Sequence, residues 1–79
     1  MPSSADECRT NGWTVGTILE GVEDRYADRI VITAIGEQEI LARRIAHCSN
    51  VAAVPQKWEP RDDDEGLWTL DCREWRKVD

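Results

Sequence analysis

The segment from Arg29 to Ile35 constrains the fold more than any other part of the chain. Its sequence is Arg-Ile-Val-Ile-Thr-Ala-Ile, in which four of the seven residues are Ile or Val and Thr33 is also β-branched. Such residues favour strands, and here apolar side chains fall on both faces of the strand. The rest of the chain must therefore cover both faces, as happens in a small, tightly curled β-barrel.

The next segment, residues 39–46, can supply a partner for that strand. Its apolar residues fit either an amphipathic helix or a strand that forms a hairpin through Gly36–Gln38. We favour the strand, because a lone strand needs a neighbour for its backbone N–H and C=O groups.

The remaining segments complete a mainly β fold, a five-stranded barrel of the Src-homology type, with one short helical turn before the last strand. The sequence predicts one domain over residues 13–79, after a flexible segment at 1–12. The further expected elements are a strand at 13–20, a polar loop at 21–28, a long loop at 48–66, a strand at 67–72 with Trp68, Leu70 and Cys72 inward, a helical turn at 73–75 and a strand at 76–78.

Charge and composition narrow the function. The chain has 79 residues, with 16 acidic and 10 basic side chains and a net charge of −6. This acidity argues against a surface that grips nucleic-acid phosphates. No apolar run approaches the length of about 18 residues that a membrane span needs, and we expect no membrane association.

The cysteines argue against a disulfide framework or a metal site. Cys8, Cys48 and Cys72 are an odd number with no Cys-x-x-Cys pair, so we expect free thiols in a reducing cytoplasm. We expect Cys48 and Cys72 to be partly buried and Cys8 to lie in a loose tail. A zinc site that combines them with His47 has the wrong spacing for a knuckle, and we expect neither metal nor cofactor.

Two features of the long loop are candidates for contact with a partner. Trp58 lies among polar residues and prolines, where it either folds back as a lid or stays exposed as an anchor for a partner. The run Asp62-Asp63-Asp64-Glu65 is either a solvated, extended loop or a contact surface, since it lacks the spacing of a calcium loop. By contrast, Trp13, Trp68 and Trp75 belong to predicted strands or their ends and are candidates for the core.

Basic side chains form a second candidate site. Arg43 and Arg73, together with Arg44, Arg76 and Lys77, lie on segments that neighbouring strands can bring together. Such a patch can hold a small anion. No catalytic residue is predicted, because His47 has no nucleophile at a suitable spacing and Cys48 points to the opposite face of a strand.

The sequences of several segments resemble those of a family of short, uncharacterised proteins of actinobacterial bacteriophages, of the mycobacteriophage type. The closing Trp-Thr-Leu-x-Cys-Arg-Glu-Trp string is its most specific part. The segments that carry the resemblance are Trp13-x-Val15-Gly16, Ile18–Gly21, Ile32–Glu37, Ile40–Arg43 and Trp68–Trp75. The resemblance implies a phage gene product in the cytoplasm of a bacterial host, and it implies no catalytic residues.

From these observations we expect a phage accessory protein, not an enzyme, that binds a host macromolecule, with a host protein as the expected partner. The expected contacts are Trp58, the run 62–65, Arg43 and Arg73. One alternative is an oligomeric counter-defence protein that captures an anionic nucleotide through Arg43, Arg44 and Arg73; another is an acidic mimic of DNA. The sequence leaves the oligomeric state open, a homo-oligomer included.

The cysteine spacing yields a first testable prediction. Treatment with a chelator should leave the melting temperature of the purified protein unchanged, because domains that depend on zinc unfold when the metal is removed. A thermal melt with and without chelator measures this. One equivalent of tightly bound zinc in the purified protein would contradict it.

Overall fold

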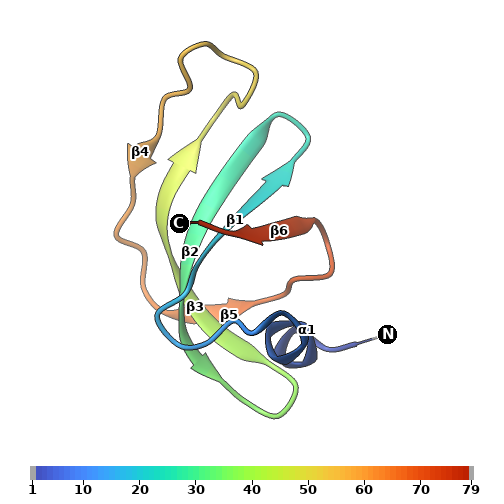
Figure 1. The fold of residues 1–79 in the computed structure, drawn as a ribbon. Coiled ribbons are helices and arrows are strands. Elements are labelled where there is room, and N and C mark those ends of the chain that lie inside the picture. Colours follow the sequence, from blue (N-terminus) through green and yellow to red (C-terminus); the bar gives the residue numbers. More distant parts are fainter. Residues whose placement is uncertain (1, 79) are drawn as a thin grey trace.

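A computed structural model describes residues 2–78, which form one helix and six strands (Figure 1). The elements are α1 (Ser4–Asn11), β1 (Ile18–Glu23), β2 (Tyr26–Ile35), β3 (Ile40–Cys48), β4 (Glu59–Pro60), β5 (Gly66–Trp68) and β6 (Glu74–Lys77). The mainly β character predicted from the sequence is confirmed.

The strands form an open antiparallel sheet and not the predicted five-stranded barrel. Their order is β4-β3-β2-β1-β6, and β5 also pairs with β3. Because β6 adds to the outside of β1 while β4 and β5 add to the outside of β3, the chain builds two edges that never meet. The expectation of closure is therefore wrong.

The central hairpin is predicted correctly in kind. Residues 29–35 lie in β2, and residues 39–46 form the favoured strand, paired with β2 from Ile35↔Ile40 to Ala27↔Cys48. The segment 21–28, expected to be a polar loop, instead lies mostly in β1 and β2. Only a tight turn separates these strands, and Asp24 adopts a φ of 56° there.

Two irregularities bend the central hairpin over the core. The register between β2 and β3 shifts between Arg29 and Ile30 and again between Ile32 and Ala34. Extra residues of this kind increase the local twist of a strand pair. The sheet consequently curls around one face, which we call the inner face, without closing on itself (Figure 1).

The inner face carries the main hydrophobic core. Leu19, Ile30, Ile32 and Ile40 are fully buried on it and contact one another through a single cluster. Ala42 of β3 also belongs to the cluster, which is completed from outside the central strands by Ala5, Cys8, Trp13, Leu70 and Trp75. The opposite face, which we call the outer face, has no helix over it (Figure 1).

Helix α1 covers one end of the inner face, although the sequence predicts a flexible segment at 1–12. Ser3 caps the helix by accepting from the Asp6 N–H, and the Asp6 carboxylate accepts from the Ser3 N–H in a capping box. The buried side chains of Ala5 and Cys8 attach it to the core. Of the predicted flexible segment, Met1 lies outside the described residues.

Hydrogen bonds tie α1 to two distant segments. The Ala5 N–H donates to the Gln38 carbonyl over 3.1 Å, and Arg9 donates to the carbonyls of Gly36 and Glu37. The Leu70 N–H donates to the Ser4 hydroxyl. The helix therefore joins the β2–β3 turn to the segment before β6.

The last part of the chain departs from the prediction. The expected strand at 67–72 is reduced to β5, Leu70 is buried as expected, and Trp68 is only half-buried. The expected helical turn at 73–75 is absent from this described segment, because β6 begins at Glu74 and pairs with β1.

The thiols also differ from expectation. Cys8 is fully buried under α1 and Cys72 is exposed, the reverse of what the sequence predicts for these two. Cys48 is buried as expected, and the three thiols are free.

A close contact between β1 and β6 yields the second prediction. A Cβ at Gly21 would lie 2.6 Å from a ring carbon of Trp75, so Gly21→Ala should push the indole out of the core and cost about 1–3 kcal/mol of folding free energy. The matched control is Gly66→Ala in β5, where a Cβ meets nothing within 4 Å. Urea unfolding of both variants measures this, and equal stabilities would show that Trp75 can move at no cost.

Candidate functional site

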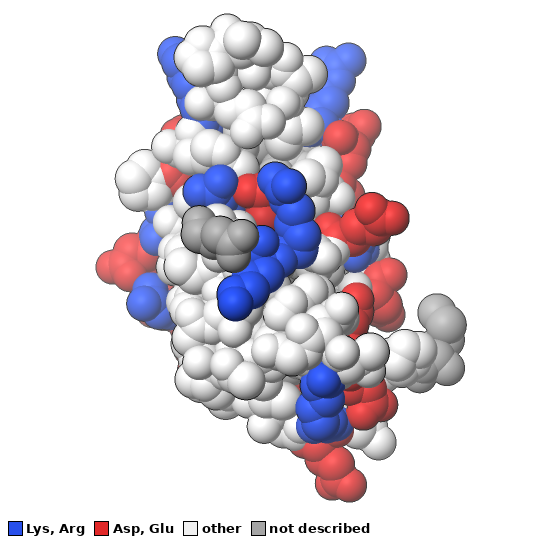
Figure 2. Space-filling model, viewed as in Figure 1, with Lys and Arg blue, Asp and Glu red and all other residues white. Residues whose placement is uncertain are grey.

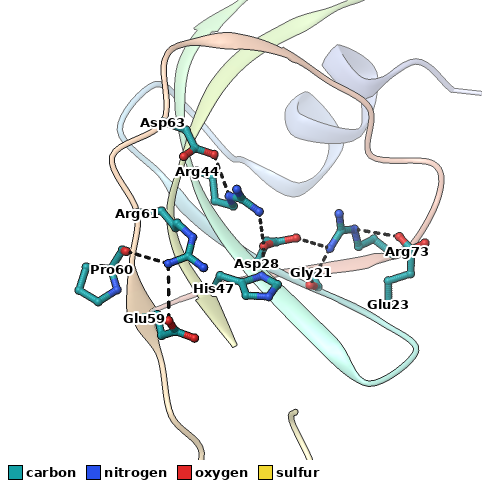
Figure 3. A network of polar contacts seen from close by, with 10 residues as sticks. All are labelled: Gly21, Glu23, Asp28, Arg44, His47, Glu59, Pro60, Arg61, Asp63 and Arg73. Atoms are coloured by element: carbon teal, nitrogen blue, oxygen red, sulfur yellow. Dashed lines mark hydrogen bonds and ion pairs between the residues drawn. The ribbon is translucent and has the colours of Figure 1, made fainter. Parts of the chain in front are cut away.

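A buried carboxylate at the inner face binds polar side chains from two other segments. Asp28 of β2 is only 3% exposed. Arg44 and His47 reach it from β3, and Arg73 reaches it from the segment before β6 (Figure 3). We call these four residues the Asp28 cluster.

The contacts within the Asp28 cluster are short. Asp28 Oδ1 lies 2.7 Å from His47 Nδ1 and 3.4 Å from an Arg44 terminal nitrogen, and Asp28 Oδ2 accepts from Arg73 over 3.1 Å. Arg44 also donates to Asp63 over 2.8 Å. Both oxygens of Asp28 are therefore occupied by partners from this chain.

Arg73 is the most enclosed of the cations. Its guanidinium lies over the ring of Trp75 at 4.9 Å, donates to the Gly21 carbonyl, and approaches Glu23 at 3.5 Å. The side chain is 12% exposed. An aromatic face, a carbonyl and two carboxylates thus fix its position, and little of it faces solvent.

The surroundings lower the pKa of Asp28. Burial by itself raises the pKa of a carboxyl group, but the hydrogen bonds from His47 and Arg73 stabilise the charged form by more, so the pKa of Asp28 lies below its ordinary value. The carboxylate is therefore charged at neutral pH and serves as an acceptor.

A second buried carboxylate lies on the outer face. Glu20 of β1 accepts from Arg29 of β2 over 3.0 Å and from Arg76 of β6 over 2.8 Å. Burial raises the pKa of Glu20, and the bonds from Arg76 and Arg29 more than reverse that effect. The ring of Trp58 lies over the Arg29 guanidinium at 4.1 Å.

The half-buried Trp58 is thus folded back onto the sheet, which is the lid alternative of the sequence. Its role as an anchor for a partner stays a prediction, because the side chain is only partly buried. The aromatic contact with Arg29 is one that sequence reasoning did not foresee, since the two residues lie in segments far apart along the chain.

The predicted basic patch is divided among internal ion pairs. Arg44 and Arg73 meet at Asp28, whereas Arg43 points to the outer face and lies 3.6 Å from Asp62. Arg76 is bound to Glu20. The structure therefore brings together two of the predicted cations, around a carboxylate that already neutralises part of their charge.

The acidic run is divided in a similar way. Asp63 is bound to Arg44, while the side chain of Asp62 is fully exposed beyond its contact with Arg43. Asp64 and Glu65 are exposed and make no ion pair within residues 2–78. Three of the four carboxylates in this run therefore remain accessible to a partner.

The arrangement around His47 offers a hydrogen-bonded Asp–His pair without a nucleophile beside it. Asp28 orients the imidazole through Nδ1, as a carboxylate does in many catalytic histidines. Cys48, however, pairs with Ala27 on the outer face and is fully buried, so its thiol is separated from His47 by the sheet.

One surface feature was not predicted from the sequence. A groove of about 340 Å³ lies on the outer face at the β2–β3 turn. Its lining is Ala34, Ile35, Gly36, Glu39, Ile40, Leu41 and Leu67. We call it the Leu67 groove. The sequence feature that could have indicated it is Leu67. Side chains alternate between the two faces of a strand, so an inward Trp68 places the apolar Leu67 on the outward face.

Two features are absent from the described residues. Between residues 2 and 78, no helix has both the length and the apolar character needed to cross a membrane. Within the same range, no set of three or more His, Cys, Asp or Glu side chains is gathered as a metal site would require.

Comparison with known proteins places the chain in a family. Residues 2–79 match the model of a family described as a domain of unknown function, DUF7241, and the chain belongs to that family. No curated protein and no solved structure matches it.

The Asp28 cluster yields the third prediction. Asp28→Asn should cost about 3 kcal/mol at neutral pH, because Arg73 loses the buried charge that compensates it. Since the pKa of Asp28 is lower in the folded chain than the value of about 3.9 in unfolded chains, the carboxylate stabilises the fold above about pH 4 and this contribution is lost as the pH falls through the folded value.

The stability difference between wild type and Asp28→Asn should therefore shrink on acidification below about pH 4. Urea unfolding across the acid range measures it. Asp64→Asn is the control, because Asp64 is exposed and its replacement should change the stability only slightly at neutral pH. A difference between wild type and Asp28→Asn that grows in acid would contradict the assignment.

Proposed function

We propose that this member of the DUF7241 family is a non-enzymatic phage accessory protein that binds a host protein in the cytoplasm of the bacterial host. The docking surface is the Leu67 groove together with the accessible carboxylates of the acidic run. The resemblance to short phage proteins supports the setting, and the outer face supplies the surface.

Leu67 carries the proposal. It is 66% exposed although it belongs to β5 and pairs directly with Leu41. The groove beside it continues over Ala34 and Ile35, so several apolar side chains share one accessible depression. An accessible apolar depression of this kind offers a partner apolar surface to bury.

The rim of the Leu67 groove defines the chemistry of the partner. Glu39 lines the groove, and Glu65 lies two residues before Leu67. The cation on the same face, Arg43, is partly neutralised by Asp62. An apolar centre with an acidic rim fits a partner surface that presents an apolar side chain between Lys or Arg residues, and the net charge of −6 favours the encounter.

Other predicted contacts contribute less to this surface. Trp58 lies over Arg29, and Arg73 is enclosed in the Asp28 cluster. The internal pairing of Arg43, Arg44 and Arg73 weakens the case for capture of an anionic nucleotide. That alternative and the acidic mimic of DNA stay predictions.

The fourth prediction tests the Leu67 groove. A protein captured from host lysate and then purified should bind Leu67→Asp about 30-fold or more weakly than wild type, as loss of a central apolar contact costs about 2 kcal/mol. Neutralising Asp62, Asp64 and Glu65 together should slow association and flatten its salt dependence.

Val15→Asp is the matched control, because Val15 is 61% exposed and lies outside the groove. Titration by calorimetry measures affinity, and a thermal melt confirms that each variant is folded. Equal affinity of wild type and Leu67→Asp would contradict the proposed docking surface.

A further inference from the structure

We propose that the Leu67 groove also receives a loop of a second copy of this chain, so that the protein associates head to tail. The loop is residues 49–56, between β3 and Lys57. The inference deepens the proposed function, on which it rests, by naming a partner for the same groove.

The loop presents an apolar, uncharged tip. Its sequence, Ser-Asn-Val-Ala-Ala-Val-Pro-Gln, contains no ionisable side chain in a protein whose residues are 33% charged. Val54 is 97% exposed, and Pro55 beside it is also exposed. Figure 2 shows this uncharged cap at the top of the molecule, where Figure 1 places the loop.

Hydrogen bonds hold the tip in one shape. The Val51 N–H donates to the Arg25 carbonyl over 2.7 Å, and the Gln56 side-chain amide donates to the Val51 carbonyl over 2.7 Å. The Asn50 side chain accepts from the Ala52 N–H. A loop held in this way loses little conformational entropy when it docks, which favours its use as an anchor.

Cations flank the tip. Arg25 lies in the turn between β1 and β2, to which the loop is hydrogen-bonded, and Lys57 follows the loop directly. Both are exposed, and neither forms an ion pair with another residue between 2 and 78. Basic side chains stand on both sides of the cap in Figure 2.

The tip therefore has the chemistry that the Leu67 groove requires. The groove is an apolar depression beside Glu39 and near Glu65, and its volume of about 340 Å³ suits small branched side chains such as that of Val54. The apolar tip matches the apolar groove, and the basic residues beside the tip match the acidic rim of the groove. The two surfaces are therefore complementary in both hydrophobicity and charge.

The two surfaces lie at opposite ends of the molecule. Figure 1 places the loop 49–56 at the top and the β2–β3 turn, which borders the groove, at the bottom. A contact between them cannot be made within one chain and is not self-complementary. Repetition of such a contact gives a heterologous chain or ring of copies, and not a closed two-fold dimer.

The expected contact is weak because one loop tip buries little surface. Interfaces below the standard size are transient, so we expect association at high protein concentration. An anionic membrane is a less suitable receiver of the tip, since the chain as a whole carries a net charge of −6.

Sedimentation velocity on the full chain over a concentration series tests the proposal. The weight-average sedimentation coefficient of wild type should rise with concentration, and the rise should diminish in high salt. Val54→Asp and Leu67→Asp should each remain monomeric, whereas the control Val15→Asp should behave like wild type.

A mixture of the two monomeric variants provides the sharpest measurement. Val54→Asp keeps an intact groove and Leu67→Asp keeps an intact tip, so an equimolar mixture should form a dimer that cannot grow further. Thermal melts verify that both variants are folded, as expected for exposed positions.

Three results of the sedimentation experiments would each overturn the inference. They are a wild type that stays monomeric up to about 1 mM, a Val54→Asp variant that associates like wild type, and a mixture that fails to form the dimer. Binding of wild type but not Val54→Asp to phosphatidylcholine–phosphatidylglycerol vesicles, without self-association, would assign the tip to membranes and also overturn it. If the protein does not self-associate but Leu67→Asp still loses binding to the captured host protein, the proposed function stands and only the self-association is excluded.

Discussion

The carboxylate of Asp28 is the contact on which the arrangement of the other segments depends. It lies in the central strand, and its two oxygens hold side chains from β3 and from the segment before β6. Without it, Arg73 would be a nearly buried cation that faces Trp75 and only one carboxylate, that of Glu23 at 3.5 Å. Charge compensation at this point therefore lets an aromatic and a guanidinium stack over the sheet, where Gly21 leaves room for the indole ring.

The sheet is asymmetric as a consequence. Its inner face receives α1 and the indole of Trp75, while its outer face carries the pairs of Glu20 with Arg29 and Arg76 and an accessible apolar groove. An open sheet in a small chain cannot cover both faces with its own residues. The part around Leu67 stays accessible, and it is there that we propose a second molecule binds.

The parts of the fold that depend on residues close together in the sequence were predictable. The β-branched density of residues 29–35 and the need of that strand for a neighbour were enough for the β2–β3 hairpin. The start of β2 was missed because Asp28 resembles a loop residue until arginines from distant segments are placed beside it. Helix α1 was missed although Ser3 and Asp6 have the spacing of a capping box, since its buried face consists of the small residues Ala5 and Cys8. The candidate contacts on the 48–66 loop could be named from sequence, but the pairing of Asp63 with Arg44 and the exposure of Leu67 depend on the register of short strands, which periodicity does not specify.

The bond between Ser4 and Leu70 spans 66 positions, and β1 is completed by a strand that begins at Glu74. Contacts between residues close together in the sequence, as in the β2–β3 hairpin, form faster than contacts across such a separation. Until Leu70 and β6 are in place, the apolar inner face of the hairpin is unprotected, and another molecule can reach a surface that the folded protein conceals.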